Sequence, residues 1–335
     1  MIEAARDGGV FPWQREIWER LQAYVTQERI PQALLLIGAP GFGTRSLADA
    51  YAALLTCETP AYGFPCGACR ACELQRAETH PDYLSIGVLE DKTDINVDQI
   101  RALIAKLMLK PQYARQRLVI IQPAEALNAN AANAFLKFLE EPTERTSILL
   151  ITEQAMRLPA TLRSRCQKIV CPNPKPAIGE QWLREQGVLA DHGELLRLAH
   201  GSPLLAKDYA NQDLLAFRRA VFEDWRRAAE GNADMPALAE QWQKLEAERL
   251  AALLEWVSGW LIDMVKLAHA ADVNCLSNPD LARQLSYYAE RLNLIDLYAF
   301  YDSVIDGLRL LRTQANKQLL LERLLIDWRR LQLAA

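Results

Sequence analysis

Two stretches of the sequence carry residues whose types and spacing could do chemistry. The first is a glycine-rich turn, LIGAPGFGTRS, in which Gly38, Gly41 and Gly43 follow an apolar run. A phosphate-binding loop has the pattern G-x-x-x-x-G-K-[ST]: backbone amides hold phosphate, the lysine neutralises charge and the hydroxyl binds magnesium. Here Thr44 stands at the lysine position and Arg45 at the hydroxyl position. Because threonine brings no cation and arginine ligates no magnesium, the P-loop is degenerate.

A second feature of P-loop enzymes is also missing. A shift of one residue would bring Arg45 and Ser46 into the motif, but only through a distorted loop. P-loop ATPases need carboxylates after a later strand, for magnesium and for the attacking water. The matching run, RLVIIQPAEAL, ends in Gln122, and Glu125 is expected on the following turn, in solvent. We therefore expect no ATP in this site, although weak binding through backbone amides is left open.

The second stretch is a cysteine cluster, CETPAYGFPCGACRAC, at 57–72. Its candidate metal ligands are Cys57, Cys66, Cys69 and Cys72. The spacing C-x8-C-x2-C-x2-C can place four sulfurs around a structural zinc and leaves no open position for catalysis. His80 is an alternative ligand, and an iron–sulfur cluster uses the same set of thiolates. Clustered cysteines in a reducing compartment favour a metal over disulfides.

The remaining cysteines and the overall composition exclude some functions. Cys166, Cys171 and Cys275 are scattered, and buried packing is expected for each. A formal net charge of −4 argues against a nucleic-acid binder with a dominant basic surface, while a local basic patch stays open. The apolar runs are too short to span a bilayer. The first residues, MIEAARDGGVFPW, lack a signal-peptide core, so we expect a cytoplasmic protein with no membrane partner.

The glycine turn and the other motifs must be positioned by the elements around them. Five short apolar runs alternate with helical stretches and occupy 33–38, 82–88, 117–122, 146–152 and 167–171. Such strands predict an α/β domain with a parallel sheet covered on both faces. Between the third and fourth runs, NANAANAFLKFLEEP at 128–142 has helical spacing and stops at Pro142.

A proline-rich segment follows this domain. The segment PNPKP at 172–176 indicates a boundary, and the sequence is helical from there on. A chain of 335 residues favours two or three domains. The predicted domains are 1–172 with the insertion 57–72, a small helical module at 173–207, and an all-α domain at 208–335. The all-α domain is expected to bury its tryptophans in a core: Trp225, Trp242, Trp256, Trp260 and Trp328.

The order of these motifs closely resembles that of the bacterial clamp-loader ATPases of the AAA+ class. The matching motifs are GAPGFG, the cysteine cluster, THPDY (79–83), NANAANAFLKFLEEP (128–142), LLIT (149–152) and LRSRC (162–166). The match by motifs covers about 1–207 and continues as helical pattern and length. It implies an AAA+ P-loop-type domain, a helical lid and a collar domain for oligomerisation. It also favours zinc at the cysteines, where it would staple the insertion.

Within that family the chain resembles the subunits that have lost both nucleotide motifs and kept SRC, here Ser164, Arg165 and Cys166. The resemblance implies that such a subunit lies beside the ATP-binding gamma or tau subunits and the delta subunit. Its SRC arginine then reaches a neighbour's nucleotide as an arginine finger, which is worth about 10³ to 10⁵ in rate. From position alone, the favoured interpretation is that Arg163 and Arg165 are solvated arginines at a sheet edge. The resemblance favours the finger.

The lid shows a third departure, because active members carry an arginine in a G-S-x-R segment and this chain has Gly201-Ser202-Pro203-Leu204. The implied role is a catalytically silent subunit of the DNA polymerase III holoenzyme, without ATPase activity of its own. The assembly would place a sliding clamp on primed DNA during DNA replication. Two alternatives are an active AAA+ ATPase and a zinc-dependent DNA-binding protein. Only Arg70 and Arg76 lie near the cysteines, which argues against the latter.

Overall fold

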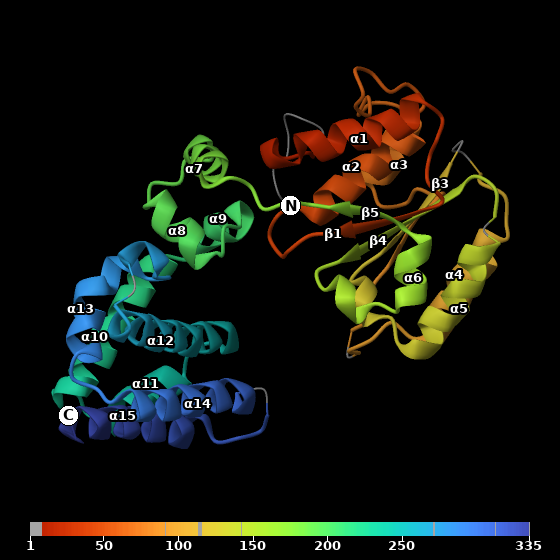
Figure 1. The fold of residues 1–335 in the computed structure, drawn as a ribbon. Helices are drawn as coiled ribbons and strands as arrows, with labels where there is room; N and C mark the ends of the chain where they lie inside the picture. The colour runs from red at the N-terminus through yellow and green to blue at the C-terminus, as the bar shows by residue number, and fades with distance from the viewer. Residues whose placement is uncertain are drawn as a thin grey trace. The chain divides into compact units, whose positions relative to one another are not determined.

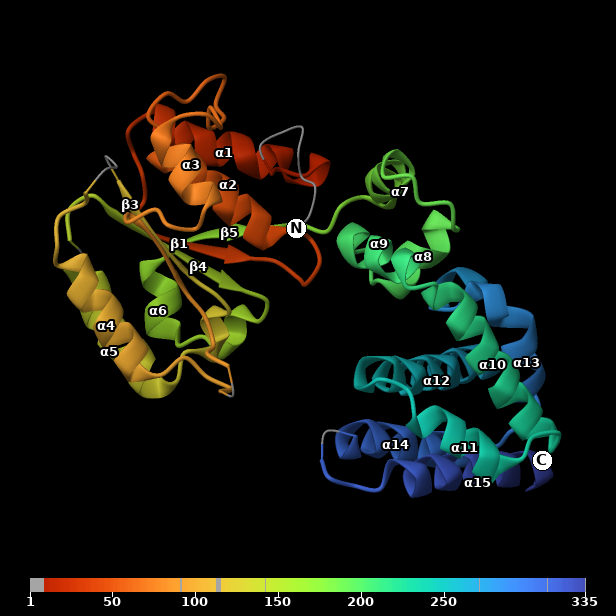
Figure 2. The ribbon, with the colours of Figure 1, turned by 180° about the vertical axis from the view of Figure 1, so that it is seen from behind.

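The chain folds into two compact units, Met1–Lys207 and Asp208–Ala335. The computed structural model (Figures 1 and 2) describes residues 9–90, 92–112, 116–141, 143–270, 272–311 and 313–334. The expected helix stop at Pro142 lies outside these residues. The further division of the first unit at 172 and 173 stays a prediction.

A parallel five-stranded sheet with the order β2-β3-β4-β1-β5 forms the centre of the first unit. Its strands are β1 (Ala33–Ile37), β2 (Tyr83–Ile86), β3 (Arg117–Ile121), β4 (Thr146–Thr152) and β5 (Gln167–Val170). Each of the five apolar runs contains one of these strands. The predicted α/β fold class with a parallel sheet is therefore confirmed.

Helices cover both faces of the sheet, with α1, α2 and α3 on one face and α4, α5 and α6 on the other (Figure 1). Because successive strand residues point to opposite faces, Leu34 and Leu36 pack toward α1 and α2, and Leu35 packs toward α4 and α5. The helices are α1 (Arg15–Thr26), α2 (Thr44–Thr56), α3 (Arg70–Arg76), α4 (Val97–Leu107), α5 (Ala129–Glu140) and α6 (Ala160–Arg165), with short 3-10 turns η1 (Pro12–Gln14), η2 (Ala124–Ala126) and η3 (Ala155–Arg157).

Three helices follow the sheet: α7 (Pro176–Glu185), α8 (His192–Leu198) and α9 (Pro203–Asn211). The indole of Trp182 on α7 contacts the aromatic rings that precede α1. Its centroid lies 5.9 Å from Phe11 and 5.5 Å from Trp13, both edge-on. This aromatic cluster ties the helical segment to the N-terminal turn, next to the glycine loop.

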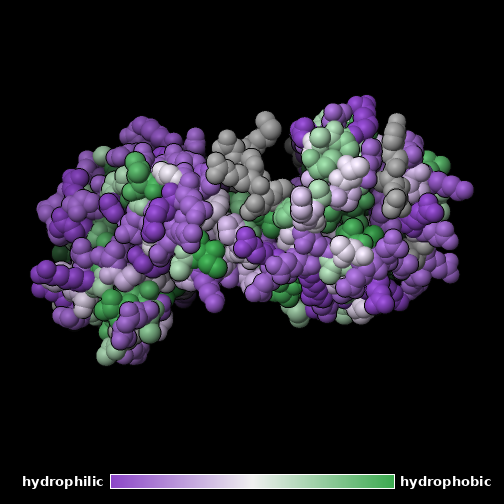
Figure 3. All heavy atoms as spheres, turned by 90° about the horizontal axis from the view of Figure 1, so that it is seen from above, coloured by the Kyte–Doolittle hydropathy of each residue, from purple (hydrophilic) through white to green (hydrophobic). Residues whose placement is uncertain are grey.

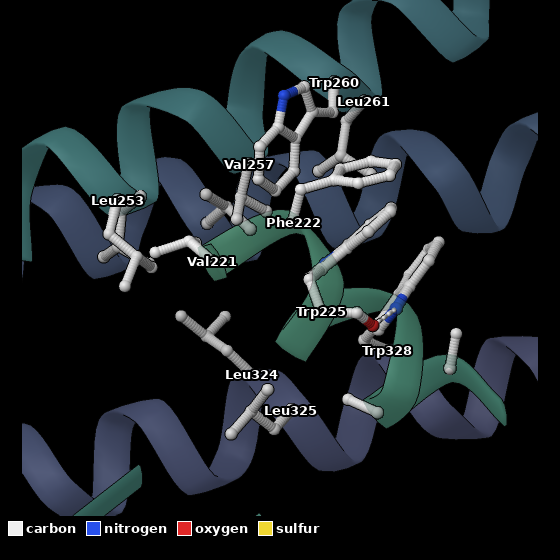
Figure 4. Packing of buried hydrophobic residues seen from close by; sticks show 14 of the residues in the cluster. Val221, Phe222, Trp225, Leu253, Val257, Trp260, Leu261, Leu324, Leu325 and Trp328 are labelled. Atoms are coloured by element: carbon white, nitrogen blue, oxygen red, sulfur yellow. Dashed lines mark hydrogen bonds between the residues drawn. The ribbon is translucent and has the colours of Figure 1, made fainter. Parts of the chain in front are cut away.

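The second unit is helical throughout its described residues. It contains α10 (Leu214–Glu230), α11 (Met235–Gln243), α12 (Ala247–Ala268), η4 (Val273–Cys275), η5 (Pro279–Leu281), α13 (Ala282–Ala289), α14 (Leu294–Leu310) and α15 (Lys317–Ala334). Figure 4 shows its core, where Trp328 stacks on Trp225 with centroids 4.0 Å apart and an interplanar angle of 14°. Trp242 and Trp260 are also buried, as predicted, and Trp256 is half-buried beside Phe217.

A buried polar network fixes the segment between α12 and α13. The guanidinium of Arg218, 1% exposed, donates to Asp280 Oδ2 at 2.7 Å and to Asn278 Oδ1 at 2.7 Å. Asp263 in turn accepts from the backbone and side-chain nitrogens of Asn278 at 2.7 and 2.8 Å. These bonds satisfy charges that would otherwise be costly to bury.

The scattered cysteines differ from one another in exposure. Cys166 and Cys171 are buried as expected, and burial raises the pKa of each thiol to about 11. Cys275 is exposed, so the expectation of buried packing is wrong for this residue. It ends η4, a turn held by backbone bonds, including one from the Cys275 nitrogen to the Asp272 oxygen at 2.8 Å. The described residues of this turn, from Asp272 to Cys275, are all exposed, so the Cys275 side chain lies at the surface with them.

The surface is largely polar. In Figure 3 most of the visible side chains are hydrophilic, and apolar residues appear in small separate groups. Among the described residues, no helix combines the length and apolar composition that a bilayer span requires.

Candidate functional site

The glycine loop connects β1 to α2, as the phosphate-binding pattern predicts, but other residues pack against it. Gly41 and Gly43 have φ values of +74° and +77°, which side chains rarely adopt. A Cβ at Gly43 would lie 2.4 Å from the ring of Phe11, and one at Gly41 would lie 2.2 Å from the hydroxyl of Ser202. Ser202 also donates to the Gly41 carbonyl at 2.7 Å. The space around both glycines is therefore occupied by the chain itself.

Further contacts fix the loop from the N-terminal side. The carbonyl oxygen of Phe42 accepts from the indole of Trp13 and from the amide of Gln14, both at 2.9 Å. Thr44, at the lysine position, is buried, and a Cβ at Gly38 would meet its hydroxyl at 2.3 Å. The loop thus keeps its tight turn and places a neutral, buried side chain where a cation would be needed.

Arg45 has protein partners that draw it away from the loop. Its Nε donates to both oxygens of Asp49 at 3.0 Å, and its Nη2 donates to the Tyr83 hydroxyl at 3.1 Å. A longer bond of 3.4 Å joins Nη1 to Gln122. Although burial opposes the charge, Asp49 and Tyr83 hold the pKa of Arg45 above its ordinary value. The geometry gives no support to a shifted motif in which Arg45 contacts phosphate.

The end of β3 has no carboxylate. Gln122 follows the strand and accepts from Arg45. Glu125 lies in η2 and is half-buried, not free in solvent as expected, because its Oε1 accepts from the backbone nitrogen of Glu153 at 3.1 Å. Burial and the nearby Glu125 raise the pKa of Glu153. Neither position of the expected carboxylate pair is filled.

Arg165 is the last residue of α6 and lies just before the edge strand β5. Its side chain is 38% exposed. Its Nη2 donates to Glu140 Oε1 at 2.6 Å and its Nη1 donates to the Thr161 carbonyl at 3.2 Å. The guanidinium is therefore at the surface, bound by one carboxylate. Sequence reasoning missed Glu140, although it belongs to the FLKFLEEP motif.

The other residues of LRSRC have local roles. Ser164 donates to the Thr161 carbonyl at 3.0 Å, and Cys166 is buried. Arg163 is half-buried and its Nη1 contacts the sulfur of Met156 at 3.1 Å. Of the two arginines, Arg165 presents more of its charge to solvent.

The four clustered cysteines lie together, with their sulfurs within 4.8 Å of one another. Cys57 is the C-cap of α2, Cys69 precedes α3 and Cys72 lies in the first turn of α3. The sulfurs of Cys57 and Cys69 are 3.9 Å apart. Sulfurs at about 2.3 Å from a tetrahedral zinc are about 3.8 Å apart, close to the 3.9 Å between Cys57 and Cys69. The four thiols are placed where they can hold a metal ion.

Hydrogen bonds already orient two of these sulfurs. The backbone nitrogens of Cys66 and Cys69 donate to the sulfurs of Cys57 and Cys66 at 3.2 and 3.3 Å. The side chain of Thr59 and neighbouring backbone N–H groups lower the pKa of Cys66 to about 6. His80 is not part of the cluster, since it is buried and its Nδ1 accepts from the Asp82 nitrogen at 3.1 Å.

The stretch Gly201-Ser202-Pro203-Leu204 has leucine where the G-S-x-R segment has arginine. Gly201 and Ser202 lie between α8 and α9, Pro203 and Leu204 begin α9, and the Ser202 hydroxyl accepts from the Leu205 nitrogen at 3.2 Å. This serine therefore caps the helix and binds the Gly41 carbonyl. With leucine at the arginine position, these four residues have no cationic side chain that could contact a phosphate.

Comparison with known proteins identifies the family. Residues 13–175 match the family model "DNA polymerase III, delta subunit", and residues 212–330 match "DNA polymerase III, delta subunit, C terminal". The DNA polymerase III subunit delta' of Pseudomonas aeruginosa is 34% identical over 326 residues, which cover 95% of this chain and 97% of that protein. The chain belongs to the DNA polymerase III delta-prime family. The resemblance inferred from the motifs is thereby confirmed.

A second delta-prime relative supports the family assignment. The delta-prime subunit of Escherichia coli is 33% identical over 279 residues, 82% of each chain. A solved structure of a DNA polymerase III gamma subunit-related protein from Thermotoga maritima covers 94% of this chain and 99% of its own, with 20% identity and a TM-score of 0.48.

Proposed function

We propose that this delta-prime family protein is a catalytically silent subunit of the replicative clamp loader. In that role it supports ATP-dependent loading of the sliding clamp on primed DNA. Family membership supports the assembly, since its relatives bear the name of a DNA polymerase III subunit. The geometry of two sites in the first unit supports a subunit that does not hydrolyse ATP itself and supplies an arginine to a neighbour's ATP site.

The first site is the glycine loop, which lacks the groups that hydrolysis needs. Phosphate transfer requires cations and oriented carboxylates that stabilise charge in the transition state. Here the lysine position is the buried Thr44, Arg45 is bound to Asp49, and Gln122 replaces a carboxylate. Phe11 packs against the loop at Gly43. These features support the proposal that the glycine loop neither binds ATP nor hydrolyses it.

The second site is Arg165, and its exposure is the observation that carries the proposal. A guanidinium at the surface, held by one exposed carboxylate, can be transferred to another anion. In the proposed complex that anion is the γ-phosphate in a gamma or tau neighbour. An arginine supplied in trans is worth about 10³ to 10⁵ in rate, or about 4 to 7 kcal/mol.

A structural zinc is proposed at Cys57, Cys66, Cys69 and Cys72. Four thiolates would close its coordination shell, so the ion would act as a staple between the end of α2 and the start of α3. In the sequence, Arg70 and Arg76 are accompanied by Glu58, Glu73 and Glu78, so the insertion carries no net basic charge for DNA. This favours stapling over DNA binding.

The all-α unit is proposed to join the collar with gamma or tau and delta subunits. One face of α15 is buried in the core through Leu321, Leu324, Leu325 and Trp328. Its outer side carries Leu319, Ile326 and Leu333, which are 62%, 40% and 70% exposed. Their spacing of seven residues places them on one stripe of the helix. We expect this stripe to lie against a neighbouring subunit in the cytoplasmic complex.

The function is tested by reconstitution with ATP-competent clamp-loader subunits. The purified chain alone should show no magnesium-dependent ATP turnover and should form a stable complex with those subunits. The Arg165→Ala variant should assemble normally. It should lower the ATP turnover of the complex by at least the part that comes from the site completed by Arg165. The matched control is Arg157→Ala, an exposed arginine in η3. Turnover by the isolated chain, or unchanged turnover with Arg165→Ala, would refute the proposal.

A further inference from the structure

The acidic end of α5 is not explained by helix stability. Glu140 is its last residue and Glu141 follows as the C-cap. The C-terminus of a helix carries partial negative charge, so carboxylates there are locally unfavourable and cations are preferred. A local rule broken in this way often marks a functional position. The acidic pair belongs to the FLKFLEEP motif, whose end has no role in the proposed function so far.

Glu140 has one clear partner, which comes from another helix. Its Oε1 accepts from Arg165 Nη2 at 2.6 Å, and Arg165 Nη1 binds the Thr161 carbonyl at 3.2 Å. The guanidinium therefore lies between the C-terminal ends of α5 and α6, where both helix dipoles attract a cation. Among the described residues, Arg165 is paired with Glu140 and not with Glu141.

The exposure of the pair makes it easy to break. The side chains of Arg165 and Glu140 are 38% and 54% exposed. Ion pairs in such positions contribute little to stability and are screened by salt. A triphosphate offers more negative charge and more acceptor oxygens than one carboxylate, so it can take the guanidinium from Glu140.

We propose that Glu140 is a positioning residue for the arginine finger. It keeps Arg165 on the subunit's own surface in the free state and releases it to the γ-phosphate of the neighbour. This inference rests on the proposed function of Arg165. It adds a carboxylate that competes with nucleotide for the finger and so sets how readily the neighbour's site is completed.

The inference predicts which kinetic quantity Glu140 controls. Only subunits with a released arginine can complete the neighbour's site. The fraction of such subunits therefore scales the apparent affinity of that site for ATP. Once the guanidinium is on the phosphate, Glu140 no longer contacts it. Removing the carboxylate should therefore change the ATP concentration that gives half-maximal turnover, and should leave the maximal turnover unchanged.

The test titrates ATP against the assembled complex of the full-length chain with ATP-competent clamp-loader subunits and measures ATP turnover. Glu140→Gln should lower the half-saturating ATP concentration by about two- to five-fold, the range of a surface ion pair. The difference from wild type should shrink as salt is raised. Glu141→Gln is the matched control, because it removes the same charge from the same helix end. It should leave both quantities unchanged.

Three results would overturn the role of Glu140: a lower maximal turnover with Glu140→Gln, an unchanged or higher half-saturating concentration, or an equal shift with Glu141→Gln. Arg165→Ala in the same series separates this inference from the proposed function. If Arg165→Ala leaves turnover unchanged, the finger itself is wrong. If Arg165→Ala lowers turnover and Glu140→Gln behaves like Glu141→Gln, the finger stands and only the role of Glu140 fails.

Discussion

Trp328→Ala tests whether the all-α unit depends on its tryptophan stack. Trp328 is fully buried, stacks on Trp225 at 4.0 Å and donates from Nε1 to the Trp225 carbonyl at 3.2 Å (Figure 4). Truncation of a buried tryptophan costs about 3 to 5 kcal/mol, and the lost hydrogen bond adds about 1 kcal/mol. The expected loss of about 4 to 6 kcal/mol is a large part of a typical unfolding free energy of about 5 to 15 kcal/mol.

Hydrogen exchange read by mass spectrometry localises this loss within the full chain. Peptides from α10, α12 and α15 should exchange through openings that need about 4 to 6 kcal/mol less, and peptides from β1, β3 and β4 should be unchanged. Leu333→Ala is the control on the same helix, because its side chain is 70% exposed, and its effect should stay within about 0.5 kcal/mol. A loss below about 1 kcal/mol for Trp328→Ala would show that the stack is not the centre of this core.

Two other changes test the buried network and the metal. Arg218→Ala should destabilise the all-α unit by about 3 to 5 kcal/mol, because Asn278 and Asp280 lose their buried cation. Chemical denaturation followed by circular dichroism measures this loss. A loss of unfolding free energy below about 1 kcal/mol would contradict the role of this network. Elemental analysis of protein purified without chelators should find about one zinc per chain, and Cys72→Ser should release it. Iron in its place, or no metal, would contradict the staple.

The sheet could be predicted from the sequence because each strand is a short apolar run bounded by turns. The bounds were less certain, since strand ends depend on contacts from elsewhere. The run at 82–88, for example, contains the strand Tyr83–Ile86. The carbonyl of Gly87 accepts from the side chain of Gln99 at 2.9 Å. Asp82 lies outside the strand and its carboxylate pairs with Arg117.

The candidate sites were predictable where ligands are close in sequence. The cysteine spacing alone indicated a metal cluster, and the four sulfurs do lie together. Contacts across long separations were not visible. Ser202 reaches the glycine loop from 161 positions away, and Arg45 reaches Gln122 across 77 positions. Glu140 likewise meets Arg165 only because α5 and α6 pack on the same face of the sheet.

The most direct test of the account isolates the one site that Arg165 completes. In a reconstituted loader, the neighbour that receives the finger is left as the only subunit with an intact P-loop lysine, so that all turnover comes from its site. The account predicts that Arg165→Ala then lowers ATP turnover by about 10³-fold or more, with assembly unchanged. Turnover equal to that of the complex with the wild-type chain would contradict it.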